Sequence, residues 1–284
     1  MPELPEMQAL AERLDAALAG RSLDRFELLG FSGLKTARPN PDELVGRILE
    51  RVSRRGKYDV FHMAGGLRVA IHLSQAGRVD LEAPPKTTKP RGSVVRLVFG
   101  PRNDEGPVAM LVREHGTQRK AGWWVLAPGD EGPMAALGPE PFDPAFADLV
   151  TKDDSNRHLH TWLRDQRVVA GIGRGHADDI LNRARRSPFV SLRSLDAAGR
   201  SDLLDAVRSV LSEALEKERT RTGGLSEARL GDRFAIHGRA GQPCPRCGEP
   251  LRRVSYDSYE IDYCAACQTG GRPLADRRLS RLLK

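Results

Sequence analysis

The sequence predicts an α+β protein with an N-terminal helix and a β-sandwich domain, followed by a helical domain and a cysteine-bearing β-hairpin. Residues 23–127 consist of short runs rich in β-branched and aromatic residues, separated by Gly, Pro, Asn and Asp clusters. Residues 143–219 change to helical periodicity, and all four cysteines fall between positions 244 and 267. At about 150 residues per domain, a chain of 284 residues has room for two domains.

The first element is a helix with one apolar face. Apolar residues recur at helical spacing at Met7, Leu10, Leu14 and Leu18. The pattern ends at Gly20, a residue type common at helix ends. Pro2 stands where a first-turn proline is favoured, and Glu3 and Glu6 suit the positive end of the helix dipole. Considered alone, these residues predict a well-capped amphipathic helix.

The segment after this helix has the pattern of a β-sandwich or barrel. The clearest strand candidates are residues 58–63, 67–73, 78–81, 93–99 and 123–126. Turn-forming residues separate these runs, as expected for short strands joined by hairpins.

The helical segment contains a turn of unusual composition. Apolar residues at helical spacing include Leu203, Val207, Val210, Leu211 and Leu215. Two helical patterns flank residues 168–173, and the second ends before Pro188. Gly171 and Gly173 permit a tight turn and let the following helix aim free N–H groups at a phosphate. The shape is that of a helix–turn–helix-like DNA element, although many helical hairpins use such glycines simply to turn. Residues 220–232 are interpreted as a mobile loop.

The four cysteines form two Cys-x2-Cys pairs, Cys244 with Cys247 and Cys264 with Cys267. Two such pairs supply the four tetrahedral sulfur ligands of one zinc ion, and the segment between them is patterned as a β-hairpin. The alternatives are two disulfides or four unrelated thiols, and disulfides are disfavoured in a chain without a secretory signal. A closed four-thiolate site leaves no position for water, so the predicted zinc is structural.

The net charge of +7 lies in the second half of the chain. Residues 1–150 hold 20 basic and 20 acidic side chains, whereas residues 151–284 hold 25 and 18. Such an excess is typical of a polyanion binder, or of a basic surface that serves solubility. No apolar run approaches the roughly 20 residues that a membrane-spanning helix needs, and no secretory signal is expected.

Several segments together resemble the formamidopyrimidine-DNA glycosylase and endonuclease VIII family. The resemblance rests on Met1-Pro-Glu-Leu-Pro-Glu6, Arg55-Gly-Lys-Tyr58, His72-Leu-Ser-Gln-Ala-Gly77, Leu137-Gly-Pro-Glu-Pro-Phe142, Gly171-Ile-Gly173, Ile236-His-Gly-Arg239 and the cysteine spacing. These pieces follow one another in the family's order over almost the whole chain. The resemblance implies a helix–two-turn–helix in the helical domain and a zinc-finger β-hairpin after it.

The resemblance also implies a bifunctional DNA glycosylase and abasic-site lyase of base excision repair. Removal of Met1 would expose Pro2 as the amine that attacks the sugar, expels an oxidised base and forms an iminium. Glu3 would protonate the sugar ring oxygen and shuttle protons, and Glu6 would order the site. Lys57 would hold a phosphate and keep the Pro2 amine unprotonated. Without the resemblance, Pro2, Glu3 and Glu6 fit helix capping, and Lys57 fits a solvated strand lysine.

The implied partner is double-stranded DNA with a damaged base or an abasic site, from which the target nucleotide is flipped out. The residues expected to face this DNA are His72, Gln75, Arg119, Lys120, Gly173, Arg174, Arg239 and Tyr259. Two of the base-probing positions depart from the family pattern. Gln75 stands where family members usually have Met, and Ala121 stands where a stacking aromatic is usual, although Arg119 keeps a cation nearby.

Two phosphate-contacting positions also depart from the pattern. Arg174 replaces the usual Asn after the Gly-Ile-Gly turn. Tyr259 stands five residues before the third cysteine, where a phosphate-gripping Arg is expected. Only Arg252, Arg253 and the basic tail offer a substitute by sequence.

The predicted organisation is a catalytic helix and β-sandwich domain over 1–130 and a helical DNA-binding domain over 131–235. A four-cysteine zinc finger over 236–268 and a basic tail over 269–284 complete it. We expect a monomer in the bacterial cytoplasm, associated with the nucleoid and not with membranes. Three alternatives are a catalytically retired damaged-DNA binder, a glycosylase for bulky or cross-linked lesions, and a zinc-ribbon transcription or replication factor.

Overall fold

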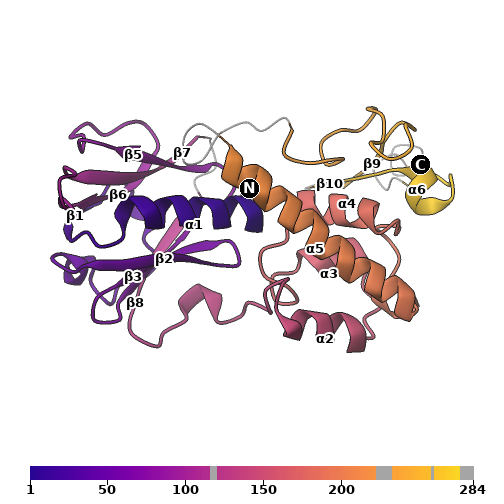
Figure 1. The fold of residues 1–284 in the computed structure, drawn as a ribbon, viewed down its shortest axis with the longest axis horizontal. Helices are drawn as coiled ribbons and strands as arrows, with labels where there is room; N and C mark the ends of the chain where they lie inside the picture. The colour runs from indigo at the N-terminus through magenta and orange to yellow at the C-terminus, as the bar shows by residue number, and fades with distance from the viewer. Residues whose placement is uncertain (116–119, 222–231, 257–258, 276–284) are drawn as a thin grey trace. The chain divides into compact units, whose positions relative to one another are not determined.

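A computed structural model describes residues 1–115, 120–221, 232–256 and 259–275. The chain divides into two compact units, each of which is formed by two stretches of sequence (Figure 1). The first unit comprises Met1–Ala136 with Leu215–Leu230, and the second comprises Leu137–Ala214 with Gly231–Lys284. The predicted loop at 220–232, Arg119 and most of the basic tail lie largely or wholly outside the described residues.

The first unit is a helix packed on two antiparallel four-stranded sheets. Helix α1 spans Leu4–Leu18. One sheet has the order β1-β6-β7-β5, formed by Leu23–Leu28, Ser93–Phe99, Val108–Glu114 and Gly77–Glu82. The other has the order β2-β3-β4-β8, formed by Leu49–Arg55, Tyr58–Met63, Arg68–His72 and Gly122–Leu126. The expected N-terminal helix and β-sandwich are therefore confirmed.

One continuous apolar core joins α1 to both sheets. The helix contributes Met7, Leu10, Leu14 and Leu18, which are the four positions that the sequence pattern singles out. Phe61 on β3, Phe99 on β6 and Trp123 on β8 are the largest side chains that the sheets add to this core. Because burial of apolar area is the dominant favourable term in folding, this core holds the start of α1 against the sheets.

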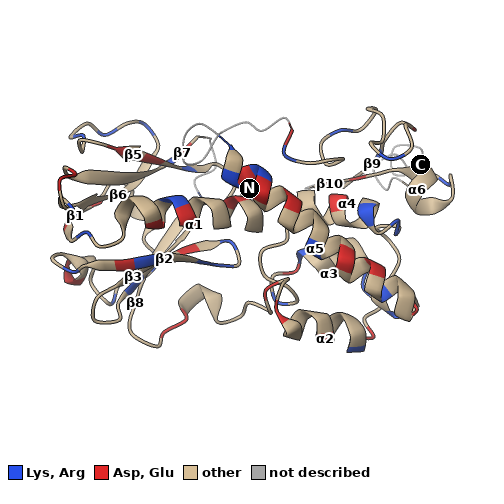
Figure 2. Ribbon diagram, viewed as in Figure 1, with Lys and Arg blue, Asp and Glu red and all other residues tan. Residues whose placement is uncertain are grey.

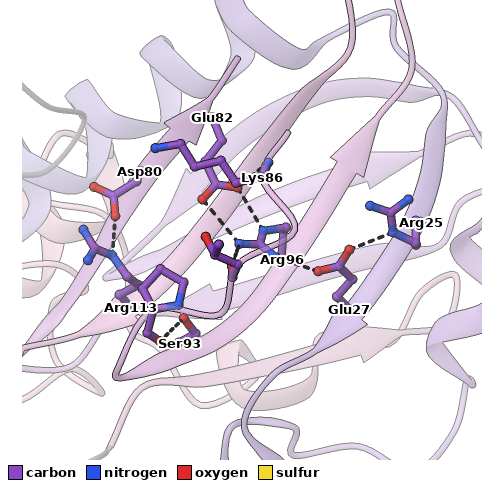
Figure 3. A network of polar contacts seen from close by, with 10 residues as sticks. Arg25, Glu27, Asp80, Glu82, Lys86, Ser93, Arg96 and Arg113 are labelled. Carbon is purple, nitrogen blue, oxygen red and sulfur yellow. Dashed lines mark hydrogen bonds and ion pairs between the residues drawn. The ribbon is translucent and has the colours of Figure 1, made fainter. Parts of the chain in front are cut away.

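A buried ion network lies on the sheet that contains β6 (Figure 3). Arg96 is only 1% exposed, and its Nε donates to Glu82 over 2.9 Å while Nη1 donates to Glu27 over 2.8 Å. The carbonyl of Thr88 accepts a further bond from Arg96 over 2.6 Å. The guanidinium therefore has partners on β1, on β5 and in the segment after β5, as a buried charge requires.

The second unit is helical at first and ends in a small hairpin. Its helices are α2 Pro144–Lys152, α3 Leu159–Arg164, α4 Arg174–Arg183 and α5 Ala197–Thr220, the last of which continues into the first unit. The hairpin consists of β9 Arg252–Ser255 and β10 Glu260–Tyr263, and it is followed by α6 Ala265–Thr269. The core around the first helices contains Phe146, Trp162, Leu163, Ile180 and Leu203.

Short 3-10 turns connect several of these elements. They span Phe31–Gly33, Pro41–Leu44, Gly132–Met134 and Leu192–Ser194.

Acidic and basic side chains both occur along α5 (Figure 2). Within the described part of the chain, no helix is both long enough and apolar enough to span a membrane.

Candidate functional site

The N-terminal residues form a buried and tightly bonded helix start. Pro2 is buried and directly precedes Glu3, the N-cap of α1. The Glu3 main-chain N–H donates to the Glu6 carboxylate over 2.6 Å, and both carboxyl side chains are less than 9% exposed. A buried pair of acids at a helix N-terminus is favoured by the free N–H groups there. The same bonds fix the direction of the chain at Pro2.

Lys57 lies in the two-residue turn between β2 and β3. Strand residues Arg55 and Tyr58 pair on either side of it. Gly56 has φ +58°, a conformation that glycine adopts without strain, and this lets the turn be so short. Lys57 is only 5% exposed although it carries an ammonium group. A buried lysine at a hairpin tip is more constrained than the solvated strand lysine that the sequence alone allows.

His72, at the end of β4, lies near both Lys57 and the chain's N-terminus. Burial lowers the pKa of His72 to about 4, with further contributions from the positive charges of Lys57 and of the N-terminal amine. The ring of Tyr58 contacts the imidazole, with ring centroids 4.9 Å apart. The structure therefore brings the N-terminus, Lys57 and a neutral histidine into one neighbourhood of the first unit.

Gln75 lies in the turn between β4 and β5 with its side chain exposed. Ser74 before it has φ +55°, and the Gly77 N–H bonds to the Leu73 carbonyl over 2.9 Å. A Cβ on Gly77 would lie 2.3 Å from that carbonyl oxygen, so the turn requires glycine there. This tight turn presents Gln75 to solvent, as a DNA-facing residue requires.

Lys120 is exposed and begins the approach to β8. The buried Glu114 carboxylate at the end of β7 accepts N–H bonds from Lys120 over 2.7 Å and from Ala121 over 2.8 Å. Arg119 falls outside the described residues. Ala121 is buried in the sandwich core, so its side chain is part of the packing.

The turn between α3 and α4 is held by one amide side chain. Gln166 Nε2 donates to the carbonyls of Arg164 and Ile172, over 2.9 and 2.7 Å, and its Oε1 accepts from the Gly171 N–H over 2.9 Å. Gly171 has φ +97°, whereas Gly173 is extended and forms the N-cap of α4. Arg174 is the first residue of that helix and is half-buried. The turn therefore supplies a helix N-terminus of the kind that binds phosphates.

Acidic residues on α4 anchor the segment that contains Arg239. The buried Asp179 carboxylate accepts N–H bonds from Ala235 and Ile236, over 2.7 and 2.9 Å. Asp178 accepts a bond from His237 Nδ1 over 2.6 Å. Arg239 follows two residues later and is half-buried. Gln166 and these two aspartates are positioning residues that the motif analysis did not identify, although the Asp-Asp pair one turn into a helix was visible in the sequence.

The four cysteines converge as a metal site. The sulfur atoms of Cys244, Cys247, Cys264 and Cys267 all lie within 4.8 Å of one another. A tetrahedral zinc with Zn–S bonds of about 2.3 Å separates its sulfurs by about 3.8 Å, and Cys247 and Cys264 are 3.5 Å apart. The donor set therefore fits one structural zinc ion, which closes the finger through its four thiolates.

Tyr259, at the position where a finger arginine is expected, lies just before β10. The guanidinium carbon of Arg164 is 4.0 Å from the centroid of its ring. Tyr256 stacks on Tyr259 with ring centroids 4.5 Å apart and an interplanar angle of 10°. Arg253 instead pairs with Glu260 and Asp262, over 2.8 Å in each case. The sequence analysis did not single out Arg164, whose contact with Tyr259 appears only in the structure.

Comparison with known proteins shows which family has this architecture. Three family models match: the formamidopyrimidine-DNA glycosylase N-terminal domain over residues 1–109, its H2TH domain over 137–224, and a zinc finger found in Fpg and IleRS over 241–270. A formamidopyrimidine-DNA glycosylase of Symbiobacterium thermophilum is 33% identical over 94% of this chain and 89% of its own length. The chain belongs to the formamidopyrimidine-DNA glycosylase family.

Other members of the formamidopyrimidine-DNA glycosylase family agree with this assignment. A formamidopyrimidine-DNA glycosylase-like protein of Mycobacterium tuberculosis is 40% identical over 52% of this chain and 95% of its own length. The crystal structure of MutM (Fpg) from Thermus thermophilus has a TM-score of 0.77 and 31% identity, and the match covers 96% of this chain and 100% of that one. A Lactococcus lactis Fpg bound to abasic-site DNA matches with a TM-score of 0.78 over 94% of this chain and 99% of that chain, and at 21% identity it shows the fold alone.

Proposed function

We propose that this protein is a bifunctional DNA glycosylase and abasic-site lyase of base excision repair. The observation that carries the proposal is the neighbourhood of the N-terminus, Lys57 and neutral His72, next to the capped start of α1. Family membership supports the reaction class, and these neighbouring groups support the proposal that the reaction takes place at the N-terminus. Two cations next to an uncharged imidazole favour an amine that gives up its proton.

The first step is attack by the Pro2 nitrogen on the anomeric carbon of the damaged nucleotide. The new N–C bond forms as the bond from that carbon to the base breaks, and the electron pair of the broken bond leaves with the base. The nitrogen loses its N–H proton, and the departing base takes up one proton, so the base leaves in its neutral form. The Glu3 carboxyl donates a proton to the sugar ring oxygen, which opens the ring and leaves an iminium at Pro2. Because the proline nitrogen then has no hydrogen, this iminium is permanently cationic.

The cationic iminium next drives strand cleavage. It acidifies the adjacent sugar carbon, and the proton of that carbon passes to a general base. The electron pair of the broken C–H bond then expels the phosphate on the 3′ side. Lys57 binds the phosphate beside the damaged nucleotide and lowers the proton affinity of the Pro2 amine by repulsion. Glu6 keeps the chain start in register through its bond to the Glu3 N–H.

The DNA partner is a duplex with a damaged base or an abasic site. Gln75 and Lys120 are exposed on turns of the first unit and serve to probe the base step, together with Arg119. The backbone of the DNA is contacted by residues of the second unit, namely Gly173, Arg174, Arg239 and Tyr259. Free N–H groups and guanidinium groups bind the phosphates there. The relatives in the comparison are bacterial, which supports action in a bacterial cytoplasm. Action as a monomer on nucleoid DNA is part of the proposal.

Borohydride trapping on a duplex with one abasic site tests the mechanism. We expect a covalent protein–DNA product with protein whose Met1 has been removed, as checked by intact-mass spectrometry. Protein that keeps Met1 is the matched control, because its Pro2 nitrogen is an amide and cannot attack. Equal trapping by both forms would contradict the role of Pro2. No adduct from processed, zinc-loaded protein that still binds the duplex would favour a non-enzymatic damaged-DNA binder.

A further inference from the structure

Arg164 stands out in the second unit because its guanidinium has no hydrogen-bond or ion-pair partner among the described residues. Its side chain is half-buried, and its one contact of note is the ring of Tyr259 at 4.0 Å. Neighbouring arginines differ, since Arg157 and Arg167 both bond to Asp165. None of its nitrogens is among the buried unpartnered atoms of the described residues, so its N–H donors are open to solvent and available to a ligand.

The placement of Arg164 over Tyr259 follows from helical spacing. His160 and Arg164 are four residues apart on α3 and therefore share one face of that helix. Both contact Tyr259, since the buried His160 ring is parallel to the tyrosine ring with centroids 6.3 Å apart. Stacking on Tyr256 in turn supports the tyrosine ring. The guanidinium therefore lies on an aromatic ring that is itself stacked on a second ring, and the cation–π contact holds it there.

This arrangement suits anion binding more than internal stability. A guanidinium that lies on an aromatic face keeps the edge of its planar fork available for bidentate bonds to phosphate. The adjacent Asp165 does not compete, because Arg167 and Arg157 hold its pKa well below its usual range and take up its charge. The Gln166 amide also ties the Arg164 carbonyl to the Gly171–Ile172 turn that leads into α4. Arg164 therefore lies at the base of the phosphate-binding turn.

We propose that Arg164, which lies on the ring of Tyr259, is a DNA-phosphate ligand that supplies a positive charge from α3 at the finger position where tyrosine stands in place of arginine. The assignment rests on the proposed function, since it needs duplex DNA as the partner. Of the two finger arginines that the sequence offers for this role, Arg253 is engaged by Glu260 and Asp262, whereas Arg252 is exposed on β9. The cation is therefore contributed by the helical part of the unit and its aromatic support by the zinc-finger hairpin.

The test is the salt dependence of binding to a duplex that contains a tetrahydrofuran abasic analogue. Arg164→Met is expected to weaken binding about 3- to 10-fold and to reduce the slope of log K against log[KCl] by about 0.9, the contribution of one phosphate contact. Arg167→Met is the matched control. It removes the same charge three residues away, from a guanidinium already bonded to Asp165, so the wild-type slope is expected.

A double-mutant cycle tests whether Arg164 binds DNA together with Tyr259 or only through its charge. Tyr259→Leu removes the aromatic ring on which the Arg164 guanidinium lies, and it is expected to weaken binding and to reduce the salt slope. The Arg164→Met/Tyr259→Leu protein should bind no more weakly than Arg164→Met alone, because the two residues act as a unit. Zinc content and thermal melting confirm that each variant is folded. A wild-type slope for Arg164→Met, or strictly additive effects, would overturn the assignment.

Trapping of the wild-type protein on abasic DNA separates failure of this inference from failure of the proposed function. If wild-type protein traps and Arg164→Met keeps the wild-type salt slope, only the Arg164 assignment is wrong. If Arg164→Met loses one phosphate contact while wild-type protein never traps, the contact stands and the enzymatic function fails. If wild-type protein does not bind the duplex, both are wrong.

Discussion

The main-chain N–H of Glu3 donates a 2.6 Å hydrogen bond to the carboxylate of Glu6 and thereby fixes how the chain enters α1. One side chain thus caps the helix and sets the position of the residue that we propose as the nucleophile. Capping and catalysis, which compete as interpretations of the sequence, are compatible in the structure.

Loss of this cap should affect stability and trapping together. Glu6→Ala is expected to lower the free energy of unfolding by about 1 kcal/mol, the typical value of an N-terminal cap, and to slow borohydride trapping. Glu6→Gln retains an acceptor oxygen for the Glu3 N–H, so it should melt close to wild type. Thermal melting and single-turnover trapping of both variants check this. An Ala variant that traps at the wild-type rate would show that the cap does not position Pro2.

His72 should make the first unit sensitive to mild acid. Its pKa in the folded protein is about 4, below the ordinary value of 6.5, so the unfolded chain binds the proton first as the pH falls. Above pH 6.5 His72 therefore adds no pH dependence to the free energy of unfolding. As the pH falls from 6.5 towards 4, stability decreases. Imidazole titration by NMR should give a midpoint near 4, and His72→Asn should flatten the pH dependence of melting in that window. A midpoint near 6.5 would contradict the burial of a neutral ring.

Asp59 on β3 should give the opposite pH dependence of stability to His72. Burial raises the pKa of this carboxyl well above its usual range, with only a partial offset from Arg54, and its Oδ1 has no hydrogen-bond partner in the described structure. The folded protein therefore binds the proton more tightly than the unfolded chain, and stability decreases as the pH rises through the folded-state pKa. Asp59→Asn should raise the melting temperature at neutral pH and leave it unchanged in acid.

The matched control for Asp59 is Asp80, which bonds Arg113 over 2.5 Å and is more than one-third exposed. Asp80→Asn should not stabilise the protein at neutral pH, because that carboxylate is solvated and paired. Equal stabilisation by the two substitutions would mean that general charge, and not burial of Asp59, sets the effect.

The Arg96 network should be costly to break on one side. Arg96→Met leaves the buried Glu82 carboxylate without its partner, and the expected loss in unfolding free energy is about 3–5 kcal/mol. Arg96→Met combined with Glu82→Met removes both charges and should recover most of this loss. Chemical denaturation of the two proteins measures the difference. A double variant as unstable as the single one would show that packing, not the unpaired charge, is responsible.

Zinc removal should unfold the finger and spare the β-sandwich. Cys244, Cys264 and Cys267 share a small apolar cluster with Ile236 and Leu251, whereas the sandwich core contains no cysteine. Chelation, or Cys264→Ser, should release one zinc per chain and weaken duplex binding, because metal binding and finger folding are the same equilibrium. Fluorescence of Trp123 and Trp124 should report a first unit that still melts cooperatively. Full duplex affinity in zinc-free protein would contradict a structural role for the metal.

The sequence predicted most of the architecture because most elements bury apolar residues at a regular period. The predicted strands at 58–63 and 93–99 coincide with β3 and β6. Strand β2 was not singled out, because four of its seven residues are charged and it lies at a sheet edge with only Leu49 and Val52 buried. Strand β7 is buried on both faces and so lacks the alternation that marks a half-buried strand.

The candidate site was predictable where its residues lie in local motifs. The buried start of α1, the turn at Lys57 and the four cysteines belong to this class. Arg164 was missed because its significance arises from a contact between α3 and the hairpin, which are far apart in the sequence. Only the four-residue spacing of His160 and Arg164 hinted at a shared face, and spacing alone does not say what that face covers.

The contact between Arg164 and Tyr259 also bears on how this lineage can exchange parts with its relatives. The cation lies on α3 and the ring next to β10, so an exchange of the finger alone would separate the two residues. A transplanted finger with arginine at position 259 would set two guanidinium groups against each other where one now lies on a ring. Inheritance of either residue therefore constrains the other, and chimeras between such proteins should tolerate a junction that keeps α3 with its own hairpin.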